Sequence, residues 1–158
     1  MYLETAAPMQ GRKLDQLKAF LQRNGLAYDE AIRFSAVLVE NEEIIAAGSL
    51  VGATIKCVAV SPDHQGEDLT AQIMTVLVQK ASEEGFRHLM LYTKPRNQHL
   101  FQPLGFHTVI RTSDVLLMEN VRGGLASFLE KLPKPADAEK PVGCIVANCN
   151  PFTNGHKY

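Results

Sequence analysis

The sequence has almost no net charge and no long hydrophobic run, and each absence excludes a class of protein. The 158 residues carry a formal net charge of −1, so the basic excess typical of nucleic-acid-binding or membrane-surface proteins is missing. No apolar run approaches the ~18 residues of a membrane-spanning helix, and the N-terminal stretch MYLETAAPMQGRK lacks the apolar core of a signal peptide. We therefore expect no nucleic-acid partner and no membrane association, and we expect the first residues to be a frayed end.

Cysteine is also scarce. The three cysteines, Cys57, Cys144 and Cys149, are odd in number, and no two of them have C-x-x-C spacing, so neither a disulfide framework nor a zinc site is expected. Cys57 lies in the apolar run IKCVAV, where we expect it to be a small buried hydrophobe. This cysteine usage predicts a reduced, cytoplasmic location and no metal site.

Hydrophobic periodicity predicts a mixed α/β domain that is followed by the first strand of a separate unit. The expected helices cover 11–25, 69–85, 97–105 and 123–132. The expected strands cover 32–40, 43–52, 54–60, 87–93, 106–112 and 115–120. The first two strands should form a hairpin, the nearly all-apolar third should be central, and the last two should be antiparallel. The segment 133–141 has three prolines in nine residues and is typical of a linker. The sequence thus predicts a domain over 1–132, a linker over 133–141, and a new buried strand and loop over 142–158.

One motif lies between the central strand and the long helix. The stretch VAVSPDHQGEDLTAQIMTVLVQKASEEG, with LFQPLGF downstream, resembles the GCN5-related N-acetyltransferase (GNAT) superfamily, which carries Gln/Arg-x-x-Gly-x-Gly/Ala there. Backbone N–H groups at such a helix N-terminus point at the pyrophosphate of coenzyme A. The resemblance implies an acyl-CoA N-acyltransferase fold with a central mixed sheet. It also implies a binding site for a coenzyme A-like ligand at Val58, Val60, Gln65, Gly66, Glu67, Asp68, Leu69 and Thr70.

The motif departs from the family where small residues are expected. Asp68 replaces a glycine and Thr70 replaces a glycine or alanine. Asp68 would place a carboxylate near the phosphates, at a cost of roughly 4 kcal/mol for charges 4 Å apart at an effective dielectric of 20. The other interpretation is that Asp68 simply N-caps the following helix. In that case the fold stays intact and coenzyme A binding is weakened or lost.

The residues that could donate a proton are also altered. Family segments like LYEKLGF often supply a tyrosine that protonates the departing thiolate, and Phe101 stands at that position; phenylalanine cannot donate a proton. Tyr92 is expected to be a core residue of its strand. His64 would either touch a phosphate or be a solvated turn residue. The other histidines of this domain are expected to lie on the surface or to be satisfied, namely His88, His99 and His107.

The last residues carry a second motif. GCIVANCNPFTNGHKY resembles the Thr/His-x-Gly-His signature of the HIGH superfamily of nucleotidyltransferases, which opens a Rossmann-like domain after its first strand. The resemblance implies a truncated start of that domain, with Thr153 and His156 as catalytic residues. It implies ATP binding by Asn150, Pro151, Phe152, Thr153, Gly155 and His156. His156 would stabilise the phosphate charge as pyrophosphate leaves, and Gly155 would allow close approach of the backbone.

Together, the two motifs resemble one family, the [citrate (pro-3S)-lyase] ligases, over nearly the whole chain. That resemblance implies an enzyme that uses ATP, with Mg²⁺, and acetate to form acetyl-adenylate. The acetyl group then passes to the phosphoribosyl-dephospho-coenzyme A thiol on the acyl carrier subunit of citrate lyase, which activates the lyase. We expect the chain to be an N-terminal portion that is inactive in ligation alone. The alternatives are an acetyl-CoA-dependent N-acetyltransferase and a non-catalytic carrier-docking domain.

Overall fold

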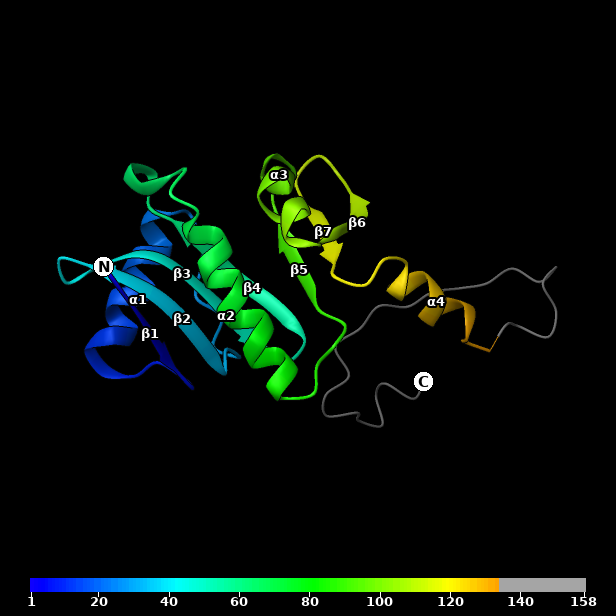
Figure 1. Ribbon diagram of the computed structural model, residues 1–158, viewed down its shortest axis with the longest axis horizontal. Coiled ribbons are helices and arrows are strands. Elements are labelled where there is room, and N and C mark those ends of the chain that lie inside the picture. Colours follow the sequence, from blue (N-terminus) through cyan, green and yellow to red (C-terminus); the bar gives the residue numbers. More distant parts are fainter. Residues whose placement is uncertain (134–158) are drawn as a thin grey trace, which may run out of the picture.

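The strand-forming segments of residues 1–133, the part of the chain that the computed structural model describes, join into one seven-stranded sheet (Figure 1). The strands are β1 (Tyr2–Ala6), β2 (Phe34–Glu40), β3 (Glu43–Val51), β4 (Thr54–Val60), β5 (Met90–Thr93), β6 (His107–Arg111) and β7 (Leu116–Glu119). Their order in the sheet is β1-β2-β3-β4-β5-β7-β6. All neighbours are antiparallel except β4 and β5, which are parallel.

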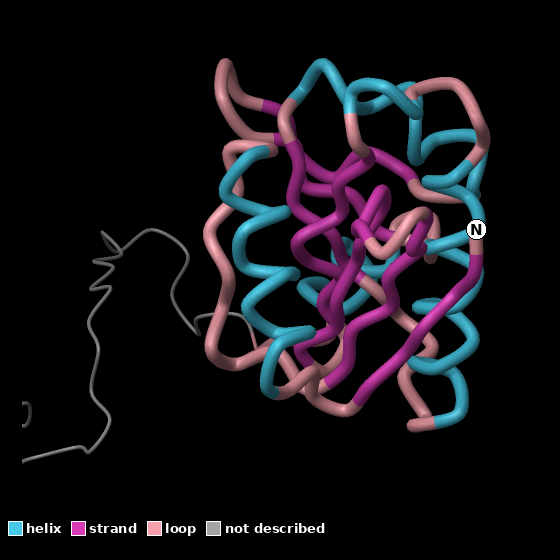
Figure 2. The backbone as a smooth tube through the Cα atoms, turned by 90° about the vertical axis from the view of Figure 1, so that its left-hand side faces the viewer, coloured by secondary structure: helices cyan, strands magenta, loops and turns pink. Residues whose placement is uncertain are grey.

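Helices cover both faces of this sheet (Figure 2). They are α1 (Gly11–Arg23), α2 (Leu69–Glu83), α3 (Gln98–Phe101) and α4 (Gly124–Glu130), with 3₁₀ turns η1 (Pro62–His64), η2 (Pro95–Asn97) and η3 (Gln102–Leu104). The apolar stripe of α2 is buried with Ile55 and Leu91 in one core cluster. The apolar stripe of α1, including Leu17 and Phe20, is buried with Val37 in a second cluster. The sheet therefore separates two cores, one under each long helix.

Gly48 on β3 lets α2 lie close to the sheet. A Cβ at this position would meet the Cγ2 of Ile73 at 2.5 Å and the Cδ1 of Leu77 at 2.8 Å. These distances are shorter than van der Waals contact, so only glycine fits without displacing the helix. The middle of α2 can therefore pack closely on β3.

The structure confirms the fold class, the hairpin of β2 and β3, the central position of β4 and the antiparallel pair of β6 and β7. The expected helix over 97–105 is instead divided into α3 and η3. The expectation of a frayed N-terminus is wrong. Residues 2–6 form β1, which pairs along its whole length with β2 from Tyr2 opposite Val39 to Ala6 opposite Ser35. Within residues 1–133, no helix has the length and apolar character needed to cross a membrane.

Candidate functional site

β4 and β5 pair for only two residues at the centre of the sheet. Thr54 lies opposite Met90 and Ile55 opposite Leu91. Further along, β4 stays paired with β3 through a bulge, at which Cys57 has a φ of 55°. A bulge bends its strand and increases the local twist. Among the described residues, the second half of β4 therefore has no strand partner on the β5 side, and Figure 1 shows the two strands diverging there.

The loop after β4 enters α2 through two residues with positive φ. Gly66 has a φ of 97°, and Asp68 has a φ of 58° and a ψ of 17°. Glycine adopts this left-handed conformation freely, and aspartate is one of the few other residues that tolerate it. Leu69, the first residue of α2, is buried, while the loop residues 65–68 are exposed. Asp68 thus adopts, with a side chain, a backbone conformation that glycine accepts freely.

Asp68 stands at the N-cap position of α2 but does not act as a cap. Its side chain makes no capping hydrogen bond within the described part of the chain, and its main-chain carbonyl accepts a hydrogen bond from the Gln72 amide at 3.3 Å. A capping side chain needs extended backbone at its own residue, which the left-handed conformation does not provide. The N-cap expectation is correct for the position and wrong for the side chain. The first-turn amides of α2 have no intrahelical acceptor.

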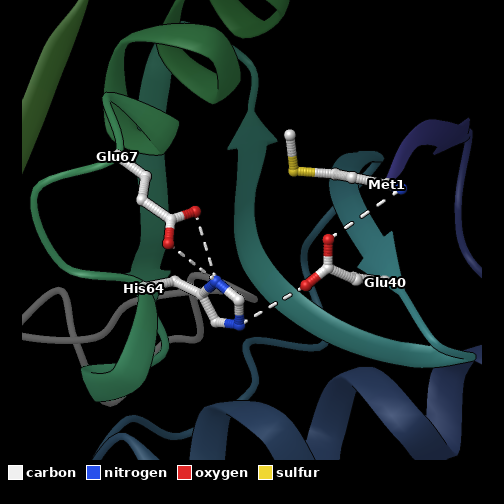
Figure 3. A network of polar contacts seen from close by, with 4 residues as sticks. All are labelled: Met1, Glu40, His64 and Glu67. Atoms are coloured by element: carbon white, nitrogen blue, oxygen red, sulfur yellow. Dashed lines mark hydrogen bonds and ion pairs between the residues drawn. The ribbon is translucent and has the colours of Figure 1, made fainter.

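A network of polar contacts connects the loop before α2 to the N-terminus and to the end of β2 (Figure 3). The Nδ1 atom of His64 lies 3.3 and 3.2 Å from the Oε1 and Oε2 atoms of Glu67. Its Nε2 atom lies 3.9 Å from the carboxylate of Glu40, which in turn lies 4.0 Å from the Met1 ammonium. The His64 side chain is 22 % exposed. His64 is therefore not a freely solvated turn residue, because its ring is held between two carboxylates.

The main chain of this loop is suited to bind a phosphate, but the negative side chains of the loop would repel one. Gly66 and the start of α2 offer main-chain donors and close approach. Glu67 and Asp68 place two exposed carboxylates beside those donors. Val58 and Val60 of β4 are half-buried and pack against the core under α2. The structure thus brings the expected coenzyme A-like site residues together around the end of β4.

The two aromatic residues near this site differ from one another in burial. Phe101 in α3 is 3 % exposed and belongs to the core under α2. Its ring carries no hydroxyl group, and a bound ligand could not reach it. Tyr92 on β5 is 57 % exposed. The expectation that Tyr92 is a core residue is wrong. The alternation of β5 directs Leu91 into the core, which leaves the neighbouring Tyr92 on the opposite face.

Tyr92 lines an open hollow of about 780 Å³ that the sequence did not reveal. The hollow lies beside the diverging part of β4 and is bordered by the connection between α1 and β2. Its lining residues are Ala27, Tyr28, Asp29, Glu30, Lys56, Cys57 and Tyr92. Because these residues come from three separate parts of the sequence, no single motif could have predicted the hollow.

Cys57 and an ion pair determine the chemistry of this hollow. Lys56 Nζ donates to Asp29 Oδ2, and the Ala31 amide donates to Asp29 Oδ1 at 2.8 Å; both bonds hold the pKa of Asp29 below its usual range. Cys57 is only partly buried, so its expected full burial is wrong. Its Sγ lies 3.5 Å from the carbonyl oxygen of Ala27, and burial raises the pKa of the thiol.

Two of the other histidines are satisfied, as expected. His88 Nε2 lies 2.6 Å from Glu119 Oε2, and His99 Nδ1 lies 2.9 Å from the carbonyl oxygen of Arg96. Glu119 is 3 % exposed, and sequence reasoning missed it because an acidic residue is rarely buried. Within residues 1–133, no group of three or more histidine, cysteine or acidic side chains is arranged to hold a metal ion.

Residues 134–158 lie outside the described part. They include most of the expected linker and every expected nucleotide-site residue, from Asn150 to His156.

Comparison with known proteins extends these observations. A model of the acetyltransferase (GNAT) family matches residues 8–106. The solved structure of Escherichia coli ElaA superposes with a TM-score of 0.66 at 15 % identity, covering 76 % of this chain and 99 % of that one. At that identity the likeness supports the fold alone.

Curated relatives of higher identity carry one name. The [Citrate [pro-3S]-lyase] ligase of Escherichia coli is 37 % identical over 150 residues, which is 94 % of this chain and 43 % of the relative. The protein of the same name from Klebsiella pneumoniae is 32 % identical over 145 residues, which is 91 % of this chain and 42 % of the relative. The chain therefore spans less than half the length of these relatives, and its resemblance to the ligase family is confirmed.

Proposed function

This chain belongs to the acetyltransferase (GNAT) family, and we propose that it serves as the GNAT-like part of a [citrate [pro-3S]-lyase] ligase. The observation that carries the proposal is the 37 % identity to such a ligase over 94 % of the chain. A family-wide GNAT fold alone would not favour a ligase, because fold does not determine function. The identity over nearly the whole chain is what links this domain to that enzyme.

The proposed reaction joins acetate to a thiol in two steps. A carboxylate oxygen of acetate attacks the α-phosphorus of ATP, which forms acetyl-adenylate and releases pyrophosphate. The thiol of the carrier's prosthetic group then attacks the acetyl carbon, loses its proton, and displaces AMP. Thr153, Gly155 and His156 are the proposed residues of this chain at the nucleotide. Mg²⁺ would offset phosphate charge there.

Within the described domain we place the coenzyme A-like prosthetic arm along the diverging end of β4. Main-chain amides at Gly66 and at the start of α2 would hold its phosphates, and Val58 and Val60 would line its path. The buried Phe101 supports a binding role over a catalytic one, because it removes the usual proton donor. The domain would then hold the arm and present its thiol.

An acetyl-CoA-dependent N-acetyltransferase is the second candidate. The observation in its favour is the exposed Tyr92 beside the same strands, which brings a phenol hydroxyl to the hollow. This candidate requires acetyl transfer from acetyl-CoA to an amine by the 158-residue chain. The ligase proposal predicts none.

Titration of the 158-residue chain with the acyl carrier subunit, with and without its prosthetic group, tests the proposal. We expect the loaded carrier to bind at least ten-fold more tightly than the unloaded one in calorimetry. Gly66→Ala should abolish this difference, because φ at this position is 97°. Gly85→Ala is the matched control, since Gly85 also has a positive φ, of 87°, and open space around it, but lies at the other end of α2. Equal binding of the two carriers would overturn the role of the domain.

The ligase assignment itself has a separate test. The 158-residue chain alone should not catalyse exchange of pyrophosphate into ATP, since it spans only 43 % of the ligase it matches. A longer polypeptide that contains this chain should acetylate the loaded carrier in the presence of ATP and acetate, as read by intact-mass spectrometry. Exchange by the short chain would contradict its expected inactivity, and failure of the long one to acetylate the carrier would contradict the ligase assignment.

A further inference from the structure

His64 stands at the end of the 3₁₀ turn η1, directly before the loop that leads into α2. The Ser61 amide donates to the carbonyl oxygen of Ile45 on β3 at 2.7 Å, and the His64 amide donates to the carbonyl oxygen of Ser61 at 3.0 Å. Pro62 fixes φ at the first position of the turn. The backbone that carries the His64 ring is therefore tied to the sheet.

The ring of His64 is the hydrogen-bond donor to Glu67. An ionised carboxylate only accepts hydrogen bonds, so the proton of this contact lies on Nδ1, which is 3.3 and 3.2 Å from the two carboxylate oxygens (Figure 3). The Glu67 amide also donates to the carbonyl oxygen of His64 at 3.5 Å. Among the residues that the structure describes, the Glu67 side chain has no other hydrogen-bond partner. His64 therefore determines where this carboxylate lies.

The Glu40 carboxylate restrains the ring from its other nitrogen. Glu40 is the last residue of β2, and its Oε2 atom lies 3.9 Å from the Nε2 atom of His64. Both nitrogens of the ring thus face a carboxylate, and the two carboxylates come from different elements. This arrangement favours the one orientation of the ring in which Nδ1 points to Glu67 (Figure 3).

Glu67 lies at a position in the chain where a carboxylate competes with a phosphate. It stands one residue before the N-cap of α2, and its side chain is 52 % exposed. The positive end of a helix attracts a carboxylate as it attracts a phosphate. A Glu67 side chain that His64 did not hold would therefore be drawn to the first-turn amides of α2, which are the donors that the proposed function assigns to the phosphates of the prosthetic arm.

We propose that His64 is a positioning residue of the pyrophosphate site, the loop 65–68 and the first turn of α2. It holds the Glu67 carboxylate and so leaves the first-turn amides open to the pyrophosphate of a coenzyme A-like ligand. The hydrogen bond from Nδ1 also offsets part of the negative charge of Glu67. This inference rests on the coenzyme A-like site of the proposed function, and it adds to that site a residue that acts through Glu67.

A double-mutant cycle, read by calorimetry of the complete 158-residue chain with coenzyme A, tests the proposal. His64→Ala should weaken binding about five-fold, because it releases one exposed carboxylate beside the phosphates. Glu67→Gln should restore the affinity of the His64→Ala chain, and it should change the affinity by less than about two-fold when His64 is present. His64→Asn should keep most of the affinity, because its amide nitrogen takes the place of Nδ1 as donor to Glu67.

The control and a second ligand separate this role from a general effect on the loop. His107→Ala is the matched control, because His107 is a partly exposed histidine on β6, which β7 separates from β5; it should leave binding unchanged. Dephospho-coenzyme A should show the same losses as coenzyme A, since it keeps the pyrophosphate. Unchanged affinity in His64→Ala, or a loss that Glu67→Gln does not relieve, would overturn the proposal. A loss confined to coenzyme A would also overturn it, because the effect would then belong to the 3′-phosphate.

Free coenzyme A makes this test separable from that of the proposed function. Equal binding of the loaded and unloaded carriers would reject the role of the domain in ligation and would leave the result for His64 standing. Absence of coenzyme A binding by the unaltered chain would reject the pyrophosphate site itself, and it would overturn the role of His64 with it.

Discussion

Replacing Asp68 by glycine should strengthen coenzyme A binding by this chain. Asp68 adopts the left-handed conformation at the start of α2, with its carboxylate exposed and without a capping hydrogen bond in the described residues. Glycine accepts the same φ of 58° without a Cβ. The substitution therefore removes one negative charge from the loop and costs no hydrogen bond of the side chain.

The size of the effect follows from screening. A carboxylate and a phosphate charge 4 Å apart repel by about 4 kcal/mol at a dielectric of 20 and by about 1 kcal/mol in water. Because Asp68 is exposed, the lower figure applies. An energy of about 1 kcal/mol corresponds to a roughly five-fold tighter dissociation constant. Stability should change little, since the relief of left-handed strain offsets the greater backbone freedom of glycine in the unfolded chain.

Calorimetry with coenzyme A at low and high salt measures this effect. Asp68→Asn is the matched control, because asparagine also tolerates left-handed backbone but carries no charge. Both variants should bind about five-fold more tightly at low salt, and the gain should shrink at high salt as the charges are screened. Unchanged affinity in both variants would refute the charge argument. A gain in the glycine variant alone would assign the effect to the backbone.

Three further predictions concern burial. Phe101→Tyr should lower stability by about 1–3 kcal/mol in chemical denaturation, because it buries a hydroxyl without a partner, and it should not create acetyltransferase activity; an active, equally stable variant would contradict the placement. Gly48→Ala should cost about 1–3 kcal/mol, because its Cβ would meet the Ile73 methyl at 2.5 Å; wild-type stability would refute that close contact. With the other two cysteines replaced by serine, Cys57 should react slowly with iodoacetamide at neutral pH. Its rate should rise with pH to an inflection above that of free cysteine, because burial raises its pKa; an inflection at or below that of free cysteine would contradict its burial.

Sequence periodicity predicted the elements that bury an apolar face, and it missed the edge strand. The segments of β2, β3, β4 and α2 carry continuous or periodic apolar residues, which is the signal that pattern reading detects. The strand β1 reads YLETA and is largely exposed. Its stability comes from main-chain pairing with β2, and main-chain pairing leaves no mark in the side chains. The frayed-end expectation failed for that reason.

The loop after β4 could be located from the sequence, and the hollow where the sheet diverges could not. Residues 65–70 are contiguous, so their motif was visible in the sequence. The exposure of Tyr92 and of Cys57 depends on the point where β4 leaves β5, which is set by the bulge at Cys57 and the short pairing of the two strands. A bulge has no fixed sequence signature. The hollow between these strands could therefore be found only from the structure.

The loss of the proton donor and the proposed reaction are physically consistent. An acetyltransferase expels a thiolate, which needs a proton as it leaves, and Phe101 cannot supply one. In the proposed ligation the thiol is the acceptor, so it gives up a proton and no thiolate leaves. A domain that only holds the thiol-bearing arm therefore loses nothing by a phenylalanine there. The same reasoning explains the loop: Glu67 and Asp68 would penalise a free, fully charged coenzyme A, and an arm tethered to a carrier protein has further contacts to offset that repulsion.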